Sequence, residues 1–375
     1  MRFRLLPVLM LSPFVTSGLL PPLRADEALD KAIDAVAPDF KKWATVCVVT
    51  RDAAGGPSFA WTDYRDTGGQ QDFWPCSTIK LYTAVAALEL LTEKGFSLDT
   101  VVTFSHQEKT DGPWITDSSR TVREMLSEVF RRSSNEDYTL LLRMAGIDRI
   151  NTRFLIPDKG FQKSALMRGY VLGRPWVYKR EEPQRVRLAT SDGSKVETWE
   201  HTWTGHSYSA DRGATIIDSK TGNVTTTRDL VECLRRILFH EQLPERERYT
   251  LSPEMLRFLR EGGGGLTGLE NKNKESGPDA WTEATEKVFP QSRFYHKCGL
   301  IEGYGLEIAA VDDSKQGGPV YLLAPAVAAG SATKPVPGTK IVGEMSLKIA
   351  EWVRNQSISA TPTPAPASPA VGAGQ

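Results

Sequence analysis

The chain has 375 residues, of which 40% are hydrophobic and 25% are charged. A chain of this length and apolar content can bury a large core, which excludes a disordered chain, a collagen-like fibre and a disulfide-stapled miniprotein. The formal net charge is zero, with 46 basic and 46 acidic side chains. Without a basic excess we expect no nucleic-acid partner.

The two ends of the sequence differ from the rest. Residues 1–25 combine three arginines with no acidic residue and the apolar run LLPVLMLSPFV, which is too short and too interrupted by proline to span a bilayer. This pattern is typical of a secretory signal ending at Ala25, and an uncleaved membrane anchor is the alternative. Residues 357–375 are rich in Ala, Pro, Ser, Thr and Gly, which predicts a disordered tail. We therefore expect an exported, periplasmic or extracellular protein with one domain over residues 26–356.

The first part of this domain alternates helix and strand. Apolar residues recur every three or four positions over Asp26–Lys42, which predicts an amphipathic helix. Two runs over Ala44–Thr50 and Ser58–Tyr64 flank a turn and predict an antiparallel hairpin. A long helix is expected to begin at about Ser77 and to stop at Gly95.

Helices are predicted to dominate the middle of the chain, over Thr121–Arg132, Glu136–Ala145, Arg228–Glu241 and Ser252–Arg260. Residues 160–226 have weaker patterns that favour one or two hairpins inside an enlarged loop region.

Strands return in the last third of the chain. They are predicted over Arg293–Cys298, Gly305–Val311 and Val320–Val327, and a helix over Val342–Arg354 follows. We therefore expect an α+β fold, in which an antiparallel sheet flanked by terminal helices adjoins a mostly helical subdomain.

The first candidate for catalysis is an S-x-x-K at the start of the long helix, formed by Ser77 and Lys80. Residues three apart share a helix face, so the amine can approach the hydroxyl and take its proton if its pKa is lowered. The tetrapeptide also occurs at Ser331–Lys334, but prolines follow it there and predict a loop that would not hold the two side chains together. Only the first copy has a suitable context.

A second motif, the S-x-N of Ser133 and Asn135, lies between two predicted helices. The segments WPCSTIKLYTAVAALELL and TVREMLSEVFRRSSNEDYTLLLRMAG resemble the penicillin-recognising serine hydrolases, and among them the class A β-lactamases most closely. The family's third motif, K-[TS]-G, lies on a strand facing the nucleophile. Lys220 has the literal K-T-G and Lys297 a degenerate K-C-G, and we favour Lys297 because it lies on a predicted strand near the end of the domain.

The resemblance implies a role for each matching residue. Ser77 would be the nucleophile, Lys80 the base for acylation or its partner, and Ser133 a proton relay to the leaving nitrogen. The substrate's amide side chain would bind Asn135, and its carboxylate would bind Lys297.

The resemblance also places Cys298, Gly299 and Leu300 beside the substrate, and the backbone N–H of Leu300 would join that of Ser77 in an oxyanion hole. Cys298 departs from the family, because it replaces a hydroxyl residue with a thiol, which is a weaker donor. A disulfide between Cys76 and Cys298 is a further hypothesis, since the mapping puts both on the floor of the site.

A second departure concerns deacylation. Class A β-lactamases use a Glu in an E-x-x-x-N loop after the S-x-N to activate water, but Lys159–Lys179 contains no acidic residue. The implied function is a serine hydrolase acylated at Ser77 by a β-lactam or a related amide. A D-Ala-D-Ala peptidase or transpeptidase-like enzyme, and a non-hydrolysing penicillin-binding or sensor module, are the alternatives.

The expected partners are small molecules, either a β-lactam or a peptide derived from peptidoglycan. We expect a monomer with no stable membrane span after cleavage of the signal. We also expect no cofactor and no metal ion, because none of the four cysteines lies in a C-x-x-C.

Overall fold

The structure is a computed structural model that describes residues 26–52, 54–109, 111–171, 183–201, 205–214, 222–271, 280–301, 303–329 and 338–359. The predicted secretory signal, Lys220 and the tail beyond residue 359 lie outside these ranges.

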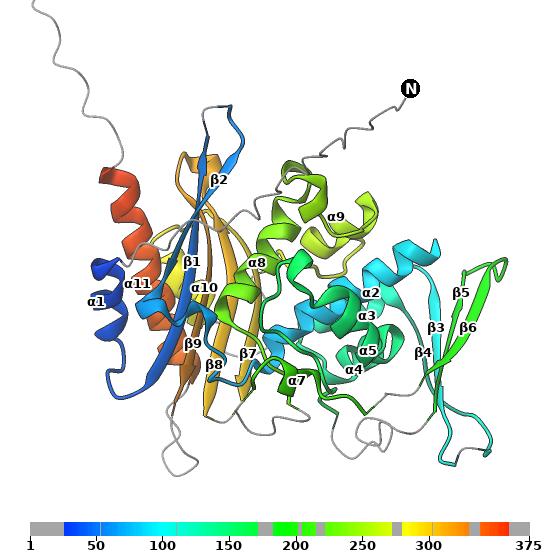
Figure 1. Cartoon of the computed structure of the whole chain (residues 1–375). Coiled ribbons are helices and arrows are strands. Elements are labelled where there is room, and N and C mark those ends of the chain that lie inside the picture. The colour runs from blue at the N-terminus through cyan, green and yellow to red at the C-terminus, as the bar shows by residue number, and fades with distance from the viewer. Residues whose placement is uncertain are drawn as a thin grey trace, which may run out of the picture.

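A five-stranded antiparallel sheet with strand order β2-β1-β9-β8-β7 forms one part of the molecule (Figure 1). The first strand of the chain therefore pairs with the last. Its strands are β1 (Lys41–Arg51), β2 (Pro57–Asp63), β7 (Arg293–Ile301), β8 (Tyr304–Asp312) and β9 (Val320–Ala328). The predicted hairpin and the three predicted C-terminal strands are confirmed.

Three helices, two of them from the ends of the described chain, pack together on one face of this sheet (Figure 1). They are α1 (Glu27–Asp34), α10 (Ala280–Glu286) and α11 (Gly338–Ser359). The prediction made α1 too long, because β1 already begins at Lys41. It made the last helix too short, since α11 continues into the segment predicted as tail.

The second part of the molecule is built around α2 (Lys80–Lys94), in which every residue from Lys80 to Leu91 is buried. A helix enclosed on all sides needs a largely apolar sequence, and KLYTAVAALELL is mostly apolar, with Lys80, Thr83 and Glu89 as its buried polar residues. Gly95 ends the helix in the left-handed conformation at φ +65°, as predicted. The neighbouring helices are α3 (Val122–Arg131), α4 (Asn135–Ala145), α8 (Thr227–Leu238) and α9 (Pro253–Glu261).

Short helical turns connect these elements. They are α5 (Ile147–Arg149), α7 (Tyr208–Asp211), the π-helical turn η3 (Ile150–Phe154) and the 3₁₀ turns η1 (Tyr64–Gly69), η2 (Cys76–Ile79), η4 (Pro157–Lys159), η5 (His240–Gln242), η6 (Glu245–Glu247) and η7 (Ser314–Gln316).

A second antiparallel sheet, of four strands in the order β4-β3-β5-β6, lies beside the helices and adds to the subdomain predicted as mostly helical (Figure 1). Its strands are β3 (Val101–His106), β4 (Ile115–Thr121), β5 (Gln184–Ala189) and β6 (Val196–His201). Only the last two correspond to a predicted hairpin. Strand β4 was missed because its sequence, ITDSSRT, is polar and half-exposed, so it lacks the alternation that marks a strand.

Candidate active site

Ser77 lies on the 3₁₀ turn η2, directly before α2, and is half-buried. Cys76, the preceding residue, has a left-handed backbone (φ +47°), which is uncommon for a residue other than glycine. The hydroxyl of Tyr170 donates a hydrogen bond to the carbonyl of Cys76 at 3.0 Å. The Ser77 hydroxyl has no hydrogen-bond partner within the described residues, so it is available to a ligand.

Lys80 begins α2 and is fully buried. Its amine donates to Asn135 Oδ1 at 2.7 Å and lies 3.1 Å from Ser133 Oγ. Burial, with a contribution from the charge of Lys297, lowers the pKa of Lys80 to about 6. At pH 7 the amine is therefore mostly neutral and can accept a proton.

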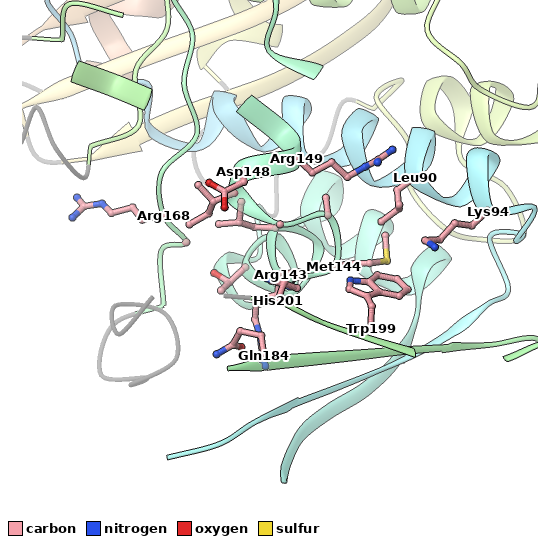
Figure 2. A pocket seen from close by; sticks show the side chains of 16 residues that line it. Leu90, Lys94, Arg143, Met144, Asp148, Arg149, Arg168, Gln184, Trp199 and His201 are labelled. Carbon is pink, nitrogen blue, oxygen red and sulfur yellow. Dashed lines mark hydrogen bonds between the residues drawn. The ribbon is translucent and has the colours of Figure 1, made fainter. Parts of the chain in front are cut away.

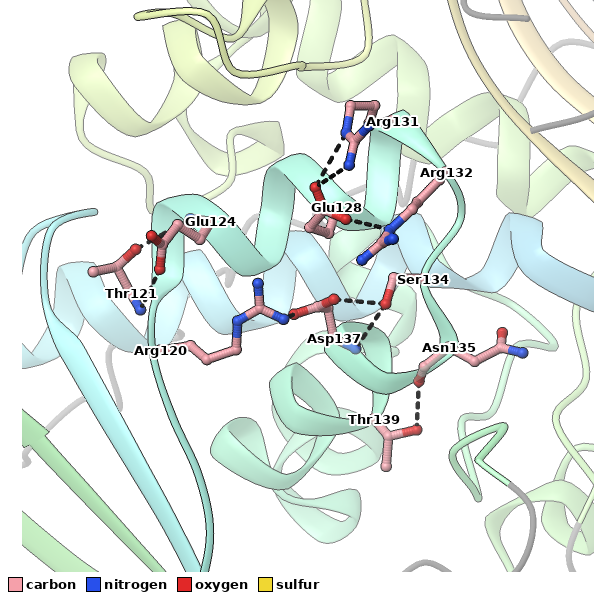
Figure 3. Close-up of polar contacts among 10 residues, drawn as sticks. All are labelled: Arg120, Thr121, Glu124, Glu128, Arg131, Arg132, Ser134, Asn135, Asp137 and Thr139. Carbon is pink, nitrogen blue, oxygen red and sulfur yellow. Dashed lines mark hydrogen bonds and ion pairs between the residues drawn. The ribbon is translucent and has the colours of Figure 1, made fainter. Parts of the chain in front are cut away.

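Ser133 lies on the turn that joins α3 to α4, and Asn135 is the first residue of α4. Figure 3 shows Asn135 and the polar contacts around this turn. Ser133 has φ +56°, and the carbonyl of Asn135 accepts a hydrogen bond from Thr139 Oγ1 at 2.8 Å. Ser134 caps α4, because its hydroxyl accepts from the backbone N–H of Asp137 at 3.2 Å and donates to that carboxylate at 2.6 Å. Arg120 pairs with the buried Asp137 at 2.5 Å. These contacts of the buried Asp137 hold the turn in place, while Asn135 stays exposed.

Lys297 reaches the same turn from β7. Its buried amine donates to Ser133 Oγ at 2.9 Å and to the carbonyl of Cys298 at 2.8 Å. Burial lowers the pKa of Lys297. The hydroxyl of Ser133 thus lies between two buried amines that come from a helix and a strand far apart in the sequence. Lys220, the other candidate for the third motif, falls outside the described residues.

Gly299 brings β7 against the nucleophile turn. A Cβ atom at position 299 would lie 2.9 Å from both the backbone nitrogen of Ser77 and Cβ of Cys76. Such distances are too short for any side chain, so the approach requires glycine. Leu300, the next residue, is 53% exposed and lies at the edge of the site.

We expect Gly299→Ala to slow acylation of the protein by a penicillin, because the added methyl pushes β7 away from Ser77. Overpacking of this kind should also lower the free energy of unfolding by about 1–3 kcal/mol. Adduct formation followed by mass spectrometry, together with denaturant unfolding, measures the two effects. Gly69→Ala is the matched control, since nothing lies within 4 Å of a Cβ there. Unchanged acylation in Gly299→Ala would contradict the prediction.

All four cysteines are buried and none of them forms a disulfide, so the structure does not contain the hypothesised disulfide between Cys76 and Cys298. Burial, and the neighbouring Cys298, raise the pKa of the Cys76 thiol. Since the thiolate is the reactive form, Cys76 does not compete with Ser77 as a nucleophile.

Two residues of the site were not predicted. Glu307 on β8 is buried and lies 3.2 Å from His296 Nδ1, and His296 Nε2 lies 2.9 Å from Asn271 Oδ1. This network supports the strand that carries Lys297. Tyr170 lies within Lys159–Lys179, the stretch without a carboxylate, and no motif in the sequence marks either Glu307 or Tyr170.

A separate cavity of about 360 Å³ lies between α4, the end of α2 and β6 (Figure 2). Its walls include Leu90, Leu142, Met144 and Trp199, and Thr139 and Gly169 connect it to the segment that carries Tyr170. None of the four residues predicted as catalytic lines it.

The comparison with family models decides the family. A model described as the "Beta-lactamase enzyme family" matches residues 28–353, which is most of the chain. The chain belongs to this family. A comparison with curated protein sequences gives no match.

Solved structures show the same β-lactamase fold at low sequence identity. The chain is similar to a class A β-lactamase from Mycobacterium abscessus, with 16% identity and a TM-score of 0.51 over 88% of this chain and 100% of that one. It is similar to a β-lactamase from Desulfarculus baarsii, with 18% identity and a TM-score of 0.51 over 88% and 98%. A point mutant of PBP-A, solved as an acyl-enzyme complex with penicillin G, gives 17% identity and a TM-score of 0.53 over 89% and 98%.

This β-lactamase-family protein contains no helix long and apolar enough to cross a membrane within its described residues. The same residues contain no group of three or more His, Cys, Asp and Glu side chains placed to hold a metal ion.

Proposed function

We propose that the protein is an exported serine hydrolase that is acylated at Ser77 by a β-lactam or a related amide. The observation that carries this proposal is the meeting of Lys80 and Lys297 at Ser133 Oγ, at 3.1 and 2.9 Å, next to the turn that bears Ser77. A hydroxyl that contacts two buried amines can donate its proton to a ligand and accept a replacement proton from one of the amines.

In the proposed reaction, Ser77 Oγ attacks the carbonyl carbon of the amide and its proton passes to the neutral amine of Lys80. The C–N bond then breaks, and the leaving nitrogen takes a proton from Ser133 Oγ, which Lys80 replaces. Lys297 supplies positive charge for the substrate's carboxylate. The backbone N–H groups of Ser77 and Leu300 would stabilise the oxyanion, and Gly299 allows the two segments to come close enough.

One observation favours a second candidate, an acylated protein that turns over slowly, such as a D-Ala-D-Ala peptidase or a penicillin-binding sensor. Within the described part of the chain, no carboxylate forms a hydrogen bond or ion pair with Ser77, Lys80, Ser133 or Lys297. A β-lactamase needs a base to clear its acyl-enzyme, and a carboxylate in the site would be the simplest one.

Mass spectrometry of the intact protein mixed with penicillin G tests the proposal. We expect a mass increase equal to one penicillin, and peptide mapping should locate it on Ser77. An adduct that disappears while penicillin is consumed indicates a β-lactamase, and a persistent adduct indicates the slow enzyme or sensor. The absence of any adduct would overturn the proposal.

We also propose that residues 1–25 direct export, so that the mature protein begins at Asp26. The N-terminal cap of α1 supports this boundary, because the Asp26 carboxylate accepts hydrogen bonds from the backbone of Ala28 and Leu29. N-terminal sequencing of protein recovered from outside the cytoplasm is expected to start at Asp26. A mature chain that still carries the leader would contradict export by cleavage.

A further inference from the structure

The cavity between α4, the end of α2 and β6 is bounded by one face of that strand (Figure 2). Burial alternates along β6, and Glu197, Trp199 and His201 are its half-buried residues. Alternate residues of a strand share a face, so Trp199 and His201, which both line the cavity, point toward the helices. The space between this face and the helices is left open, and Trp199 stays partly exposed beside it.

The walls of the cavity are mainly apolar. Leu90, Leu142, Met144 and Ile147 form the helical wall, and Trp199 belongs to the wall formed by β6. Sites for small molecules are typically cavities of about 300–1,000 Å³ with apolar walls and a few polar groups. This cavity, of about 360 Å³, lies in that range. An apolar cavity of about 150 Å³ is enough to bind benzene, so there is room here for more than one aromatic ring.

Most of the charged side chains that line the cavity are paired with groups that do not line it. Three of its cations form ion pairs with carboxylates of this kind, which are Lys94 with Glu197, Arg143 with Asp117 and Arg149 with Glu93. A ligand in the cavity would have to compete with these carboxylates for each cation.

The two remaining charged residues of the wall are engaged as well. Arg168 points away from the other lining side chains, and its guanidinium lies 5.3 Å from the centre of the Trp74 ring (Figure 2). Asp148 accepts a hydrogen bond from the hydroxyl of Tyr208 at 2.9 Å. Among the described residues, each charge that lines the cavity therefore has a partner already.

Two uncharged polar side chains also line the cavity. His201 Nε2 lies 2.8 Å from the carbonyl of Arg143, and burial lowers the pKa of His201, so the imidazole is neutral at pH 7 and donates this hydrogen bond. The buried side chain of Gln184 adds an amide, which can donate and accept. The polar part of the wall is therefore suited to a neutral hydrogen-bonding group.

A charged ligand would lose its hydration in this cavity while the surrounding charges are already engaged, which costs much more than the transfer of a neutral molecule. We propose that the cavity is a second ligand site, which binds a neutral, mainly apolar small molecule with its rings packed against Trp199. The inference is independent of acylation at Ser77, because none of the residues proposed as catalytic lines the cavity.

Two fluorescent probes with the same ring system test the class of ligand. N-phenyl-1-naphthylamine is neutral, and 8-anilino-1-naphthalenesulfonate carries a sulfonate on the same rings. When each is titrated into the intact protein, we expect the neutral probe to bind one saturable site with a rise in emission, and the sulfonate to bind roughly tenfold more weakly or worse. Absence of saturable binding of the neutral probe, or equal or tighter binding of the sulfonate, would overturn the inference.

Two substitutions on opposite walls locate the bound probe. Trp199→Ala removes the aromatic surface, and Ile147→Trp fills the space from the helical side, so each is expected to weaken binding of the neutral probe roughly tenfold or more. Trp61→Ala is the matched control, because Trp61 is a half-buried tryptophan of β2 that does not line the cavity.

A thermal melt shows which variants are folded, and one folded variant of the cavity is enough for the test. Weaker binding in that variant, with wild-type binding in Trp61→Ala, supports the inference. Unchanged binding in a folded Trp199→Ala or Ile147→Trp variant overturns it, and so does an equal loss of binding in Trp61→Ala. None of these outcomes depends on whether penicillin G acylates the protein.

Discussion

Replacing Ser77 with alanine is expected to abolish covalent binding of penicillin G. The proposed acyl bond forms at Ser77 Oγ, and the alanine variant has no atom that could replace it. The described cysteines offer no alternative nucleophile close by, since Cys76 is buried and its pKa is raised. Mass spectrometry after incubation with penicillin G should therefore detect only the unmodified variant.

Ser194→Ala is the matched control for this experiment, because Ser194 is exposed on the turn between β5 and β6. It should be acylated like the wild type. An adduct on Ser77→Ala with the same mass increase would show that another residue is the nucleophile, and the assignment of the site would then be wrong.

Replacing Lys80 with methionine is expected to slow acylation by about 10²–10⁴-fold, the usual contribution of a general base. Methionine fills a similar volume but cannot accept the Ser77 proton. In the wild type the pKa of Lys80 is lowered to about 6 by burial and by the charge of Lys297. The acylation rate should therefore rise with pH as the amine loses its proton near pH 6, and level off above that value. The rate of adduct formation measured against pH tests both statements.

The exposed Lys315 provides the control, and Lys315→Ala should acylate at the wild-type rate with the same pH dependence. If Lys80→Met retained the wild-type rate, another group would have to be the base. If the wild-type rate were constant through pH 6, the amine would not titrate where its environment implies.

Lys80→Met should slow acylation but raise the stability of the folded protein. Between a pKa of about 6 in the folded state and 10.5 as the ordinary value, Lys80 is protonated in the unfolded chain but mostly neutral in the folded one. The unfolded state therefore binds more protons in this window, so the contribution of Lys80 to the free energy of unfolding rises with pH. Below this window the cost of burying the charge is present in full. We expect Lys80→Met to melt at a higher temperature than the wild type at pH 7, and a lower melting temperature would contradict a neutralised, destabilising amine.

The sequence was sufficient for the parts of the site that depend on local spacing. Ser77 and Lys80 are three residues apart at the start of a helix, and a strong apolar pattern marks that helix. The choice of Lys297 over the literal K-T-G at Lys220 depended on the order of elements, and the structure places Lys297 against Ser133.

The parts that could not be predicted depend on contacts between distant segments. Strand β3 is central to the second sheet only because it pairs with β5, whose Val186 lies opposite Phe104. No local pattern in VVTFSH distinguishes such a strand from a buried loop. Tyr170 is similar, because its importance comes from the carbonyl of Cys76 and the ring of Tyr138, and neither contact leaves a trace in the residues around it.

The pairing of β1 with β9 has a consequence for the order in which the molecule is assembled. Thr45 lies opposite Ala324, so the five-stranded sheet closes only when the last strand of the chain is available. The helical region that carries Lys80, Ser133 and Asn135 is encoded earlier, but its core also contains Tyr295 of β7 and Leu322 of β9, so it too is completed only by the last strands. The second amine of the site, Lys297, arrives with the same strands. A chain truncated before β7 would contain Ser77 but lack Lys297. Acylation activity therefore requires that the whole chain has been synthesised.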